Sequence, residues 1–213
     1  MKITGAIFDF DGTLFDSMPL WKGIRKKFFD RIGLVLSEED EKLFEGLFLR
    51  ESLILAKDRY GIAESCEELF AQFFDYMKEL YLAHAYPKND IINFLEKLKA
   101  SGVKMGIATA TGESALTAVL EKFGMLGFFE AIYSTYTVGA AKTEPKVYDT
   151  VLEALGTDKS TTWVFEDALY AAKTVKAYGY NLVGIYDESE PNTAELERIS
   201  DIYIHNYSEI ETE

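Results

Sequence analysis

The sequence has little of several residue types that mark specialised classes of protein. A single cysteine, Cys66, excludes an internal disulfide and agrees with a reducing compartment. Only four prolines and no low-complexity run argue against a disordered or fibrous chain. No stretch approaches the roughly 20 apolar residues of a membrane span, and the N-terminus MKITGAIFDF lacks the apolar core of a signal peptide. We therefore expect a cytoplasmic protein.

Positive charge is also scarce, because 22 Lys and Arg face 36 Asp and Glu, which leaves a net charge of −14. No segment gathers basic residues densely, so we expect neither nucleic acid nor an anionic membrane as a partner. The chain does have 48% hydrophobic and 14% aromatic residues, enough for a sizeable core. Its 213 residues suit one domain with a large insertion, or a large and a small domain. We take a monomer as the default.

Short apolar segments alternate with helical patterns over most of the chain. Strands are predicted where β-branched and apolar residues form runs that end at polar residues: 3–8, 103–109, 130–134, 161–166, 181–187 and 201–205. Helices are predicted where apolar residues recur three and four apart: 89–100, 113–123, 145–155, 168–178 and 192–199. This rhythm predicts a doubly wound, Rossmann-like α/β core with a parallel sheet between two layers of helices.

Residues 17–86 have a different pattern, without strand candidates. Apolar residues recur at helical spacing from Cys66 to Tyr81, and Ser37 precedes three acidic residues as a helix N-cap does. Gly33, Gly46 and Gly61 are expected to separate helices. The sequence therefore predicts an all-helical domain at 17–86, inserted into a core made of 1–16 and 87–213.

Acidic and phosphate-compatible side chains follow the predicted strands. Asp9 and Asp11 end the first strand, Thr109 ends the second, Glu166 and Asp167 end the fourth, and Lys142 lies in the loop after the third. Open parallel sheets bind ligands at the carboxyl ends of their strands, so we expect these residues to meet. A hard divalent cation such as Mg²⁺ prefers oxygen ligands and explains clustered carboxylates that are otherwise costly to bury.

Four motifs, FDFDGTLFDS, IATAT, AAKTEP and VFED, resemble in order and spacing those of the haloacid dehalogenase-like hydrolase superfamily. The helical insertion is similar to the helical cap of its phosphatase and phosphomutase branch. The resemblance covers essentially the whole chain, and it implies a Mg²⁺-dependent phosphatase that acts on a small phosphorylated metabolite.

The resemblance also implies roles. Asp9 would be the nucleophile that forms an aspartyl-phosphate, and Asp11 the general acid and base. Asp9, the backbone carbonyl of Asp11, and Asp167 would hold Mg²⁺, with Glu166 assisting directly or through water. The residues that would bind or surround the phosphate are Gly12, Thr109, Ala110 and Lys142. Lys146 competes with Lys142, and the proline that follows favours Lys142. Asp16 and Ser17 are expected to cap the first helix of the insertion rather than to touch substrate.

Some positions depart from the family pattern. AAKTEPKVY stands where GKPxPD is usual, and Ala168 and Ala171 replace a common Ser and Gly. None of these changes removes a reacting group, although they can alter loop geometry or helix packing.

The alternatives differ in what they require of the sequence. Dehalogenases and phosphonate-cleaving relatives do not need Asp11. A β-phosphoglucomutase-like mutase is the nearest alternative, but it carries a histidine in the first cap helix where this chain has Trp21. A phospho-receiver module would have about 120 residues and no helical insertion. A catalytically silent phosphate-binding module is the remaining alternative, and the presence of every reacting group argues against it.

Substrate choice is expected to lie in the insertion. Met18, Leu20, Trp21 and Arg25 are candidates to face the site, although their spacing also fits a helix core. Arg50 in GLFLR, residues 46–50, imperfectly matches the GxxR stretch of the mutase and is either a substrate ligand or a solvated charge. The sequence selects no particular phosphate ester.

Overall fold

In a computed structural model of the protein, residues 3–47 and 49–210 are described. The predicted core segments, 1–16 and 87–213, are therefore described from residue 3 and up to residue 210. Phe48 of the predicted insertion lies outside the described residues.

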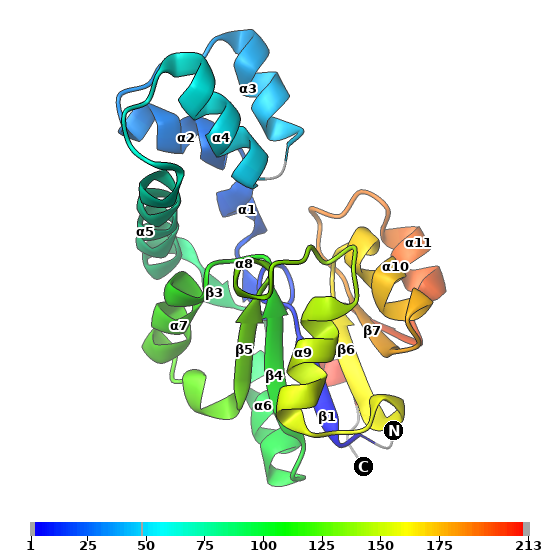
Figure 1. The fold of residues 1–213 in the computed structure, drawn as a ribbon. Coiled ribbons are helices and arrows are strands. Elements are labelled where there is room, and N and C mark those ends of the chain that lie inside the picture. The colour runs from blue at the N-terminus through cyan, green and yellow to red at the C-terminus, as the bar shows by residue number, and fades with distance from the viewer. Residues whose placement is uncertain (1–2, 48, 211–213) are drawn as a thin grey trace.

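A six-stranded parallel sheet forms the centre of the molecule, in the order β5-β4-β1-β6-β7-β8 (Figure 1). The strands begin and end close to the predicted residues: β1 Gly5–Phe8, β4 Lys104–Thr109, β5 Ala131–Ser134, β6 Thr162–Glu166, β7 Asn181–Ile185 and β8 Ile202–Ile204. The predicted fold class, a doubly wound α/β core with a parallel sheet, is confirmed.

Helices cover both faces of this sheet. Phe8 of β1 packs in one cluster with the helices α6 (Ile91–Ala100) and α7 (Glu113–Lys122). The neighbouring Ile7 packs in the other cluster with α9 (Lys146–Leu155), α10 (Leu169–Ala177) and α11 (Thr193–Ile199). Alternate residues of a buried strand face opposite layers, which explains why GAIF is apolar throughout.

The strand order reverses direction beside β1. The chain runs from β1 through β4 to β5 on one side, and then crosses to β6, β7 and β8 on the other. Ligands of open α/β sheets bind at such a switch point, outside the carboxyl ends of the strands. Residues that follow β1, β4 and β6 are therefore in the expected position for a site.

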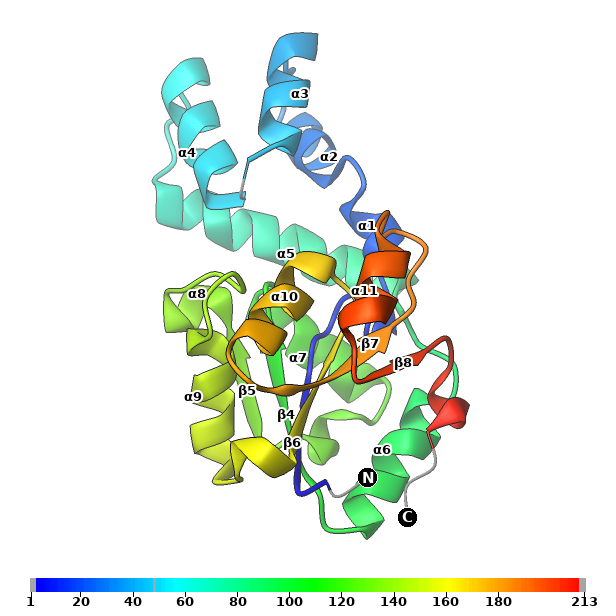
Figure 2. The same cartoon turned by 90° about the vertical axis from the view of Figure 1, so that its right-hand side faces the viewer.

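The helical insertion, our name for residues 17–86, lies above the carboxyl ends of the strands (Figure 2). Its helices are α1 Met18–Trp21, α2 Ile24–Arg31, α3 Glu38–Glu45, α4 Leu49–Tyr60 and α5 Cys66–His84. Ser37 caps α3 as predicted, because its side chain accepts a hydrogen bond from the Asp40 backbone N–H. The predicted breaks are also observed, since Gly33, Gly46 and Gly61 each directly follow a helix or its last turn.

The strand pair at the base of the insertion was not predicted. A short antiparallel ribbon pairs β2 (Phe15–Asp16) with β3 (Tyr86–Pro87) where the chain leaves and re-enters the core. Residues 17–86 are thus helical up to a last residue that belongs to a strand. Two residues are too few to show an alternating pattern, and a proline in the second strand argues against a strand by composition.

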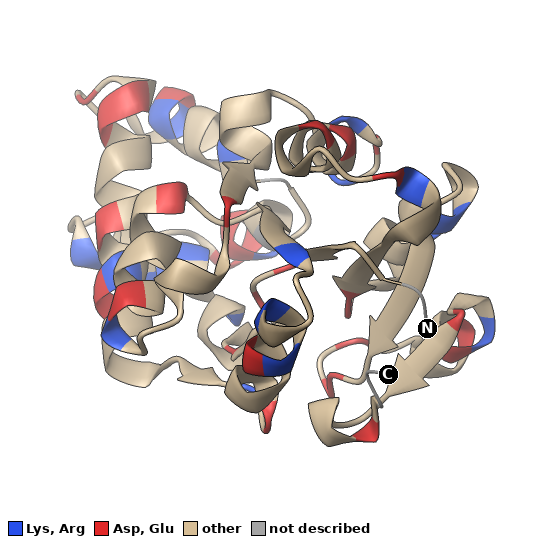
Figure 3. Ribbon diagram, turned by 90° about the horizontal axis from the view of Figure 1, so that it is seen from below, with Lys and Arg blue, Asp and Glu red and all other residues tan. Residues whose placement is uncertain are grey.

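The structure also shows how charge and hydropathy are distributed over the elements. Acidic and basic residues are interspersed over the helices and strands of the molecule (Figure 3). Among the described residues, no helix combines the length and the apolar character needed to cross a membrane.

Candidate active site

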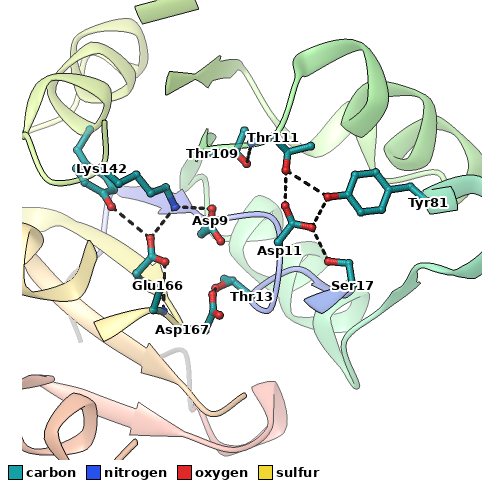
Figure 4. Close-up of polar contacts among 12 residues, drawn as sticks. Asp9, Asp11, Thr13, Ser17, Tyr81, Thr109, Thr111, Lys142, Glu166 and Asp167 are labelled. Atoms are coloured by element: carbon teal, nitrogen blue, oxygen red, sulfur yellow. Dashed lines mark hydrogen bonds and ion pairs between the residues drawn. The ribbon is translucent and has the colours of Figure 1, made fainter. Parts of the chain in front are cut away.

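The strand ends bring the predicted residues together (Figure 4). Asp9 follows β1, Thr109 ends β4, and Glu166 and Asp167 end and follow β6. Lys142 reaches them from the loop between α8 (Thr135–Val138) and α9. Hydrogen bonding divides these residues into two groups, one around Asp9 and one around Asp11.

The first group, which we call the acidic half of the site, consists of Asp9, Thr13, Lys142, Glu166 and Asp167. The Lys142 ammonium donates to Oδ1 of Asp9 and, at 2.7 Å, to Oε2 of Glu166. All three of these side chains are buried, with Lys142 only 3% exposed. The structure thus places Lys142 against Asp9, whereas its competitor Lys146 is exposed at the start of α9.

Burial controls the ionisation of the acidic half. Burial, against the opposing effect of the Lys142 ammonium and with smaller contributions from the charges of Glu166 and Asp11, raises the pKa of Asp9 to about 8. Burial and the charge of Asp9 likewise hold the pKa of Asp167 well above its ordinary range. One ammonium therefore does not balance the three carboxylates of Asp9, Glu166 and Asp167.

The donor set of the acidic half fits Mg²⁺. One carboxylate oxygen from each of Asp9, Glu166 and Asp167 lies within 4.8 Å of the others. Mg²⁺ prefers oxygen ligands, and its charge would compensate the excess of buried carboxylates. The Lys142 ammonium bonds Asp9 and Glu166, whereas Asp167 accepts a hydrogen bond from the Thr13 hydroxyl at 2.8 Å.

Gly12 is required by the close approach of the chain to Asp167. Its φ is +78°, and a Cβ at this position would lie 2.2 Å from Oδ2 of Asp167. No side chain fits there, so glycine allows the turn after β1 to pass directly beside the acidic half.

The second group, which we call the hydroxyl half, surrounds Asp11. Ser17 Oγ and Tyr81 Oη each donate to Oδ1 of Asp11 at 2.6 Å, and Thr111 Oγ1 donates to Oδ2. These donors come from three places: the start of the helical insertion, its helix α5, and the loop after β4. Asp11 is therefore bonded by neutral hydroxyls, while Asp9 is bonded by an ammonium.

The prediction that Ser17 caps the first insertion helix is wrong as far as its side chain is concerned. Ser17 occupies the N-cap position of α1 but makes no capping hydrogen bond, because its buried hydroxyl is bonded to Asp11. A bond to a carboxylate is charge-assisted and stronger than one to a backbone N–H. The neighbouring Asp16 is exposed in β2 and does not cap the helix either.

Thr109 and Ala110 connect the two halves. Thr109 is fully buried, and its hydroxyl oxygen accepts a hydrogen bond from the Thr111 backbone N–H at 2.9 Å. Its hydroxyl hydrogen is thus available to an acceptor. Ala110 lines the cavities beside the strand ends.

Two cavities open beside these residues. The first, of about 200 Å³, is lined by Lys142 and the carboxylates of the acidic half, together with Asp11, Met18 and Trp21. The second, of about 530 Å³, extends away from the first and is bordered by Arg50 and Tyr136. The residues that line both are Ala110, Lys142 and Tyr170. The small cavity is of a size for a phosphate group, and the larger one adjoins it.

The insertion residues that were candidates to face the site lie in different surroundings. Met18 and Trp21 line the smaller cavity, whereas Leu20 packs against the apolar core. Arg25 is bonded to Ser52 and to the Leu47 carbonyl.

Arg50 borders the larger cavity. Its guanidinium lies 5.6 Å from the centre of the Phe70 ring, so it is positioned by an aromatic face rather than only solvated.

Sequence reasoning missed several residues that the structure brings to the site. Thr13 and Thr111 lie within or beside quoted motifs, so their positions carried a signal that was not used. Tyr81 was predicted only as part of an apolar helix face. Two tyrosines next to quoted motifs were also missed: Tyr148, whose hydroxyl lies 3.3 Å from Oε2 of Glu166, and Tyr170.

Fold and site together define the class: an α/β protein with a helical insertion and a buried carboxylate–lysine centre at the switch point of its sheet. The model of the haloacid dehalogenase-like hydrolase family matches residues 6–185, which is most of the chain. The protein belongs to this family. The predicted membership, and with it the prediction of an enzyme of the hydrolase class, is confirmed.

Relatives with assigned names share most of the chain. A phosphorylated carbohydrates phosphatase of Thermotoga maritima is 24% identical over 174 residues, 82% of this chain and 81% of the relative. Hexitol phosphatase B of Escherichia coli is 27% identical over 183 residues, 83% of this chain and 80% of the relative. The crystal structure of CbbY from Rhodobacter sphaeroides in complex with phosphate has a TM-score of 0.79 at 18% identity and covers 97% of this chain and 96% of its own. The last comparison supports the fold alone.

Proposed function

We propose that this protein is a Mg²⁺-dependent phosphatase that hydrolyses a small phosphomonoester through an aspartyl-phosphate on Asp9. The observation that carries the proposal is the buried contact of Asp9 with Lys142 and Glu166, with a carboxylate oxygen of Asp167 within 4.8 Å. A carboxylate nucleophile needs a neighbouring cation to approach a phosphate dianion, and the acidic half supplies the residues to hold one.

The side chains suggest a division of labour in two displacements. An oxygen of Asp9 forms a bond to phosphorus while the bond from phosphorus to the leaving oxygen breaks, and Asp11 gives that oxygen a proton. Water then attacks the phosphorus of the aspartyl-phosphate and gives a proton to Asp11, while the bond between Asp9 and phosphorus breaks, which releases inorganic phosphate and restores the Asp9 carboxylate. The positive charge of Lys142 stabilises the phosphoryl oxygens, the Thr109 hydroxyl and the Ala110 backbone N–H donate to them, and Gly12 leaves room for them.

Asp9, Asp167 and the backbone carbonyl of Asp11 would hold Mg²⁺, with Glu166 assisting directly or through water. Bound Mg²⁺ offsets the negative charge of the carboxylates and the phosphate. The contact between Glu166 and Lys142 favours an indirect contribution from Glu166.

The substrate class follows from the cavities and the relatives. We place the phosphate in the smaller cavity and the leaving group in the larger one, where Arg50 and Tyr136 offer polar and aromatic contacts. Trp21 would then border the phosphate on the insertion side. Since similar proteins are named as phosphatases of phosphorylated carbohydrates and hexitols, we propose a phosphorylated carbohydrate as substrate. The helical insertion would act as a cap over it, and we propose a monomer in the cytoplasm.

The proposal is tested by phosphate release from a panel of phosphorylated sugars and polyols, with Mg²⁺ and with a chelator. We expect release that stops on chelation and is absent in Asp9→Asn. Activity that survives both chelation and this substitution contradicts the proposal.

A mutase of phosphosugars is the second candidate, and the position of Arg50 favours it, because a guanidinium at the larger cavity suits a second phosphate. β-Glucose 1-phosphate with a trace of the 1,6-bisphosphate separates the two. Formation of glucose 6-phosphate without phosphate release would establish the mutase instead.

A further inference from the structure

The hydroxyl half contains a tyrosine that the proposed reaction does not by itself require. Tyr81 is fully buried on α5, and its ring packs edge-on against Phe10 at 5.8 Å between centroids. Its hydroxyl donates to Oδ1 of Asp11 at 2.6 Å and lies 3.3 Å from Thr111 Oγ1. The phenol of Tyr81 thus links the helical insertion to the chain that follows β1 through a hydrogen bond.

The surroundings of Tyr81 show that its hydroxyl is not needed for packing. Leu69, Phe73 and Met77 precede it at intervals of four residues on the buried face of α5. The three are apolar, and a phenylalanine in the fourth place would fill nearly the same volume. The hydroxyl bonds Asp11 and Thr111, and Trp21 of the insertion is a further side-chain neighbour of it.

The bonds on Asp11 distinguish its two oxygens. A carboxylate oxygen has two lone pairs, so the hydroxyls of Ser17 and Tyr81 occupy both positions on Oδ1. Within residues 3–47 and 49–210, one hydroxyl, that of Thr111, is recorded on Oδ2. Oδ2 therefore keeps a lone pair for the proton that is transferred.

We propose that Tyr81 is a positioning residue for Asp11: by occupying Oδ1 from the helical insertion, it presents Oδ2 as the oxygen that protonates the leaving group. The inference rests on the proposed phosphatase function. In the first displacement, the bond between Asp9 and phosphorus forms, the bond to the leaving oxygen breaks, and that oxygen takes its proton from Oδ2 of Asp11. The seating of α5 on the core thereby affects this proton transfer.

A comparison of two leaving groups separates positioning from a structural role. An alkyl phosphate, such as a hexitol phosphate, needs a proton on its leaving oxygen, whereas 2,4-dinitrophenyl phosphate has a stable leaving anion. We expect Tyr81→Phe to lower kcat/KM at least about ten-fold for the alkyl ester and less than about three-fold for the aryl ester, in the same direction as Asp11→Asn. This constant reports steps up to leaving-group departure, so hydrolysis of the phosphoenzyme does not enter.

The matched control is Tyr60→Phe. Tyr60 also lies on an insertion helix, and its phenol also donates to a carboxylate, that of Asp40, away from both cavities. We expect unchanged kcat/KM for both esters in this variant. If Tyr81→Phe lowers the two constants equally, or neither, the inference is overturned.

Thr111 provides a second variant should Tyr81→Phe unfold. Thr111→Val removes the hydroxyl on Oδ2 and is expected to lower kcat/KM selectively for the alkyl ester, while Thr111→Ser restores it. Equal losses for both esters in Thr111→Val, or no rescue by serine, overturn the positioning of Asp11 by its hydroxyl partners. Failure of the proposed function is distinguishable, because the unaltered protein would then release no phosphate from either ester with Mg²⁺.

Discussion

Asp9 and Asp11 are separated by a single residue, but the acidic half and the hydroxyl half bond them in very different ways. Asp9 is bonded by Lys142, which comes from the core, and it lies beside two further carboxylates. Asp11 is bonded by three neutral hydroxyls, and two of them, from Ser17 and Tyr81, belong to the helical insertion. The comparison indicates that the proposed nucleophile, Asp9, is bonded from the core, whereas the proposed acid and base, Asp11, is bonded partly from the insertion.

The largest effect is expected from substitution of Asp9, at the centre of the acidic half. Asp9→Asn removes the nucleophile while keeping the size of the side chain, so kcat/KM should fall by about 10³ or more. The measurement is phosphate release with Mg²⁺, beside a thermal melt that verifies folding. A variant that keeps more than a tenth of the activity would show that Asp9 is not the nucleophile.

The next largest effect is expected from substitution of Lys142, which carries the only ammonium among the described residues of the acidic half. Lys142→Met should lower kcat/KM by about 10² to 10³, because the phosphoryl oxygens lose an electrostatic partner in a buried site. Lys146→Met is the matched control, since this lysine is four residues further on and exposed. Equal activities of the two variants would contradict the role of Lys142.

Sequence analysis predicted that the carboxylates of the acidic half meet, because they end or directly follow strands whose ends are marked by motifs, but it missed Thr13. The order and the ends of β1, β4 and β6 were sufficient to bring Asp9, Glu166 and Asp167 together. The hydroxyl half was not predicted, since Tyr81 and Thr111 lie 70 and 100 positions from Asp11 in the chain. Only packing of α5 on the core reveals that one residue of an apolar helix face is a hydrogen-bond donor.

Sequence reasoning was limited in the same way for the short strands β2 and β3 and for the helical insertion. The β2–β3 ribbon is too short to have a pattern, and Ser17 was assigned to a cap because a local bond is the simplest use of a serine before a helix. Sequence reasoning favoured a core position for Trp21 and a solvated one for Arg50, because the cavities that they line are formed only by the folded chain. The prediction that they influence substrate choice stays a prediction.

Mg²⁺ should stabilise the protein more at high pH than at low pH. Burial raises the pKa of Asp9 from 3.8 to about 8. Between these values the folded protein without Mg²⁺ binds more protons than the unfolded chain, so its stability falls as pH rises.

Under the proposed function, Mg²⁺ would bind the ionised carboxylates and oppose this loss. At about 100 times the Kd it adds about 2.7 kcal/mol, or roughly 5–10 °C in Tm. Melts with and without Mg²⁺ at pH 5 and pH 8 test this, with Ca²⁺-free buffer as the reference condition. A Mg²⁺-induced shift that is equal or larger at pH 5 would contradict the role of the carboxylates.

A smaller effect concerns the chain that returns from the insertion. Lys88 follows β3 and donates to the buried Asp187 at 2.6 Å. Burial raises the pKa of Asp187, but hydrogen bonds from Lys88 and Ser189 outweigh it and hold this pKa below 3.8. The pair therefore stabilises the fold above about pH 4, and this contribution is lost as pH falls through the lowered pKa.

Lys88→Gln tests this anchor of the ribbon. It should cost about 1.5–3 kcal/mol at pH 7, where a charged partner is left in place, and less as the pH falls below about 4. Thermal melts across this range measure it, and Lys173→Gln, in a surface pair with Glu195, is the control. A cost that does not change with pH would mean that Lys88 acts by packing rather than by charge.

The smallest effect is expected from substitution of Arg50, which borders the larger cavity beyond both halves of the site. Arg50→Ala should raise KM for a phosphorylated carbohydrate by about ten-fold and leave kcat within about two-fold, because a contact to the leaving group in the larger cavity is made equally in the ground and transition states. KM for a small aryl phosphate should change little, since its leaving group does not extend to Arg50. If kcat falls with both substrates instead, Arg50 influences the reacting groups, and the separation of the larger cavity from the acidic and hydroxyl halves is wrong.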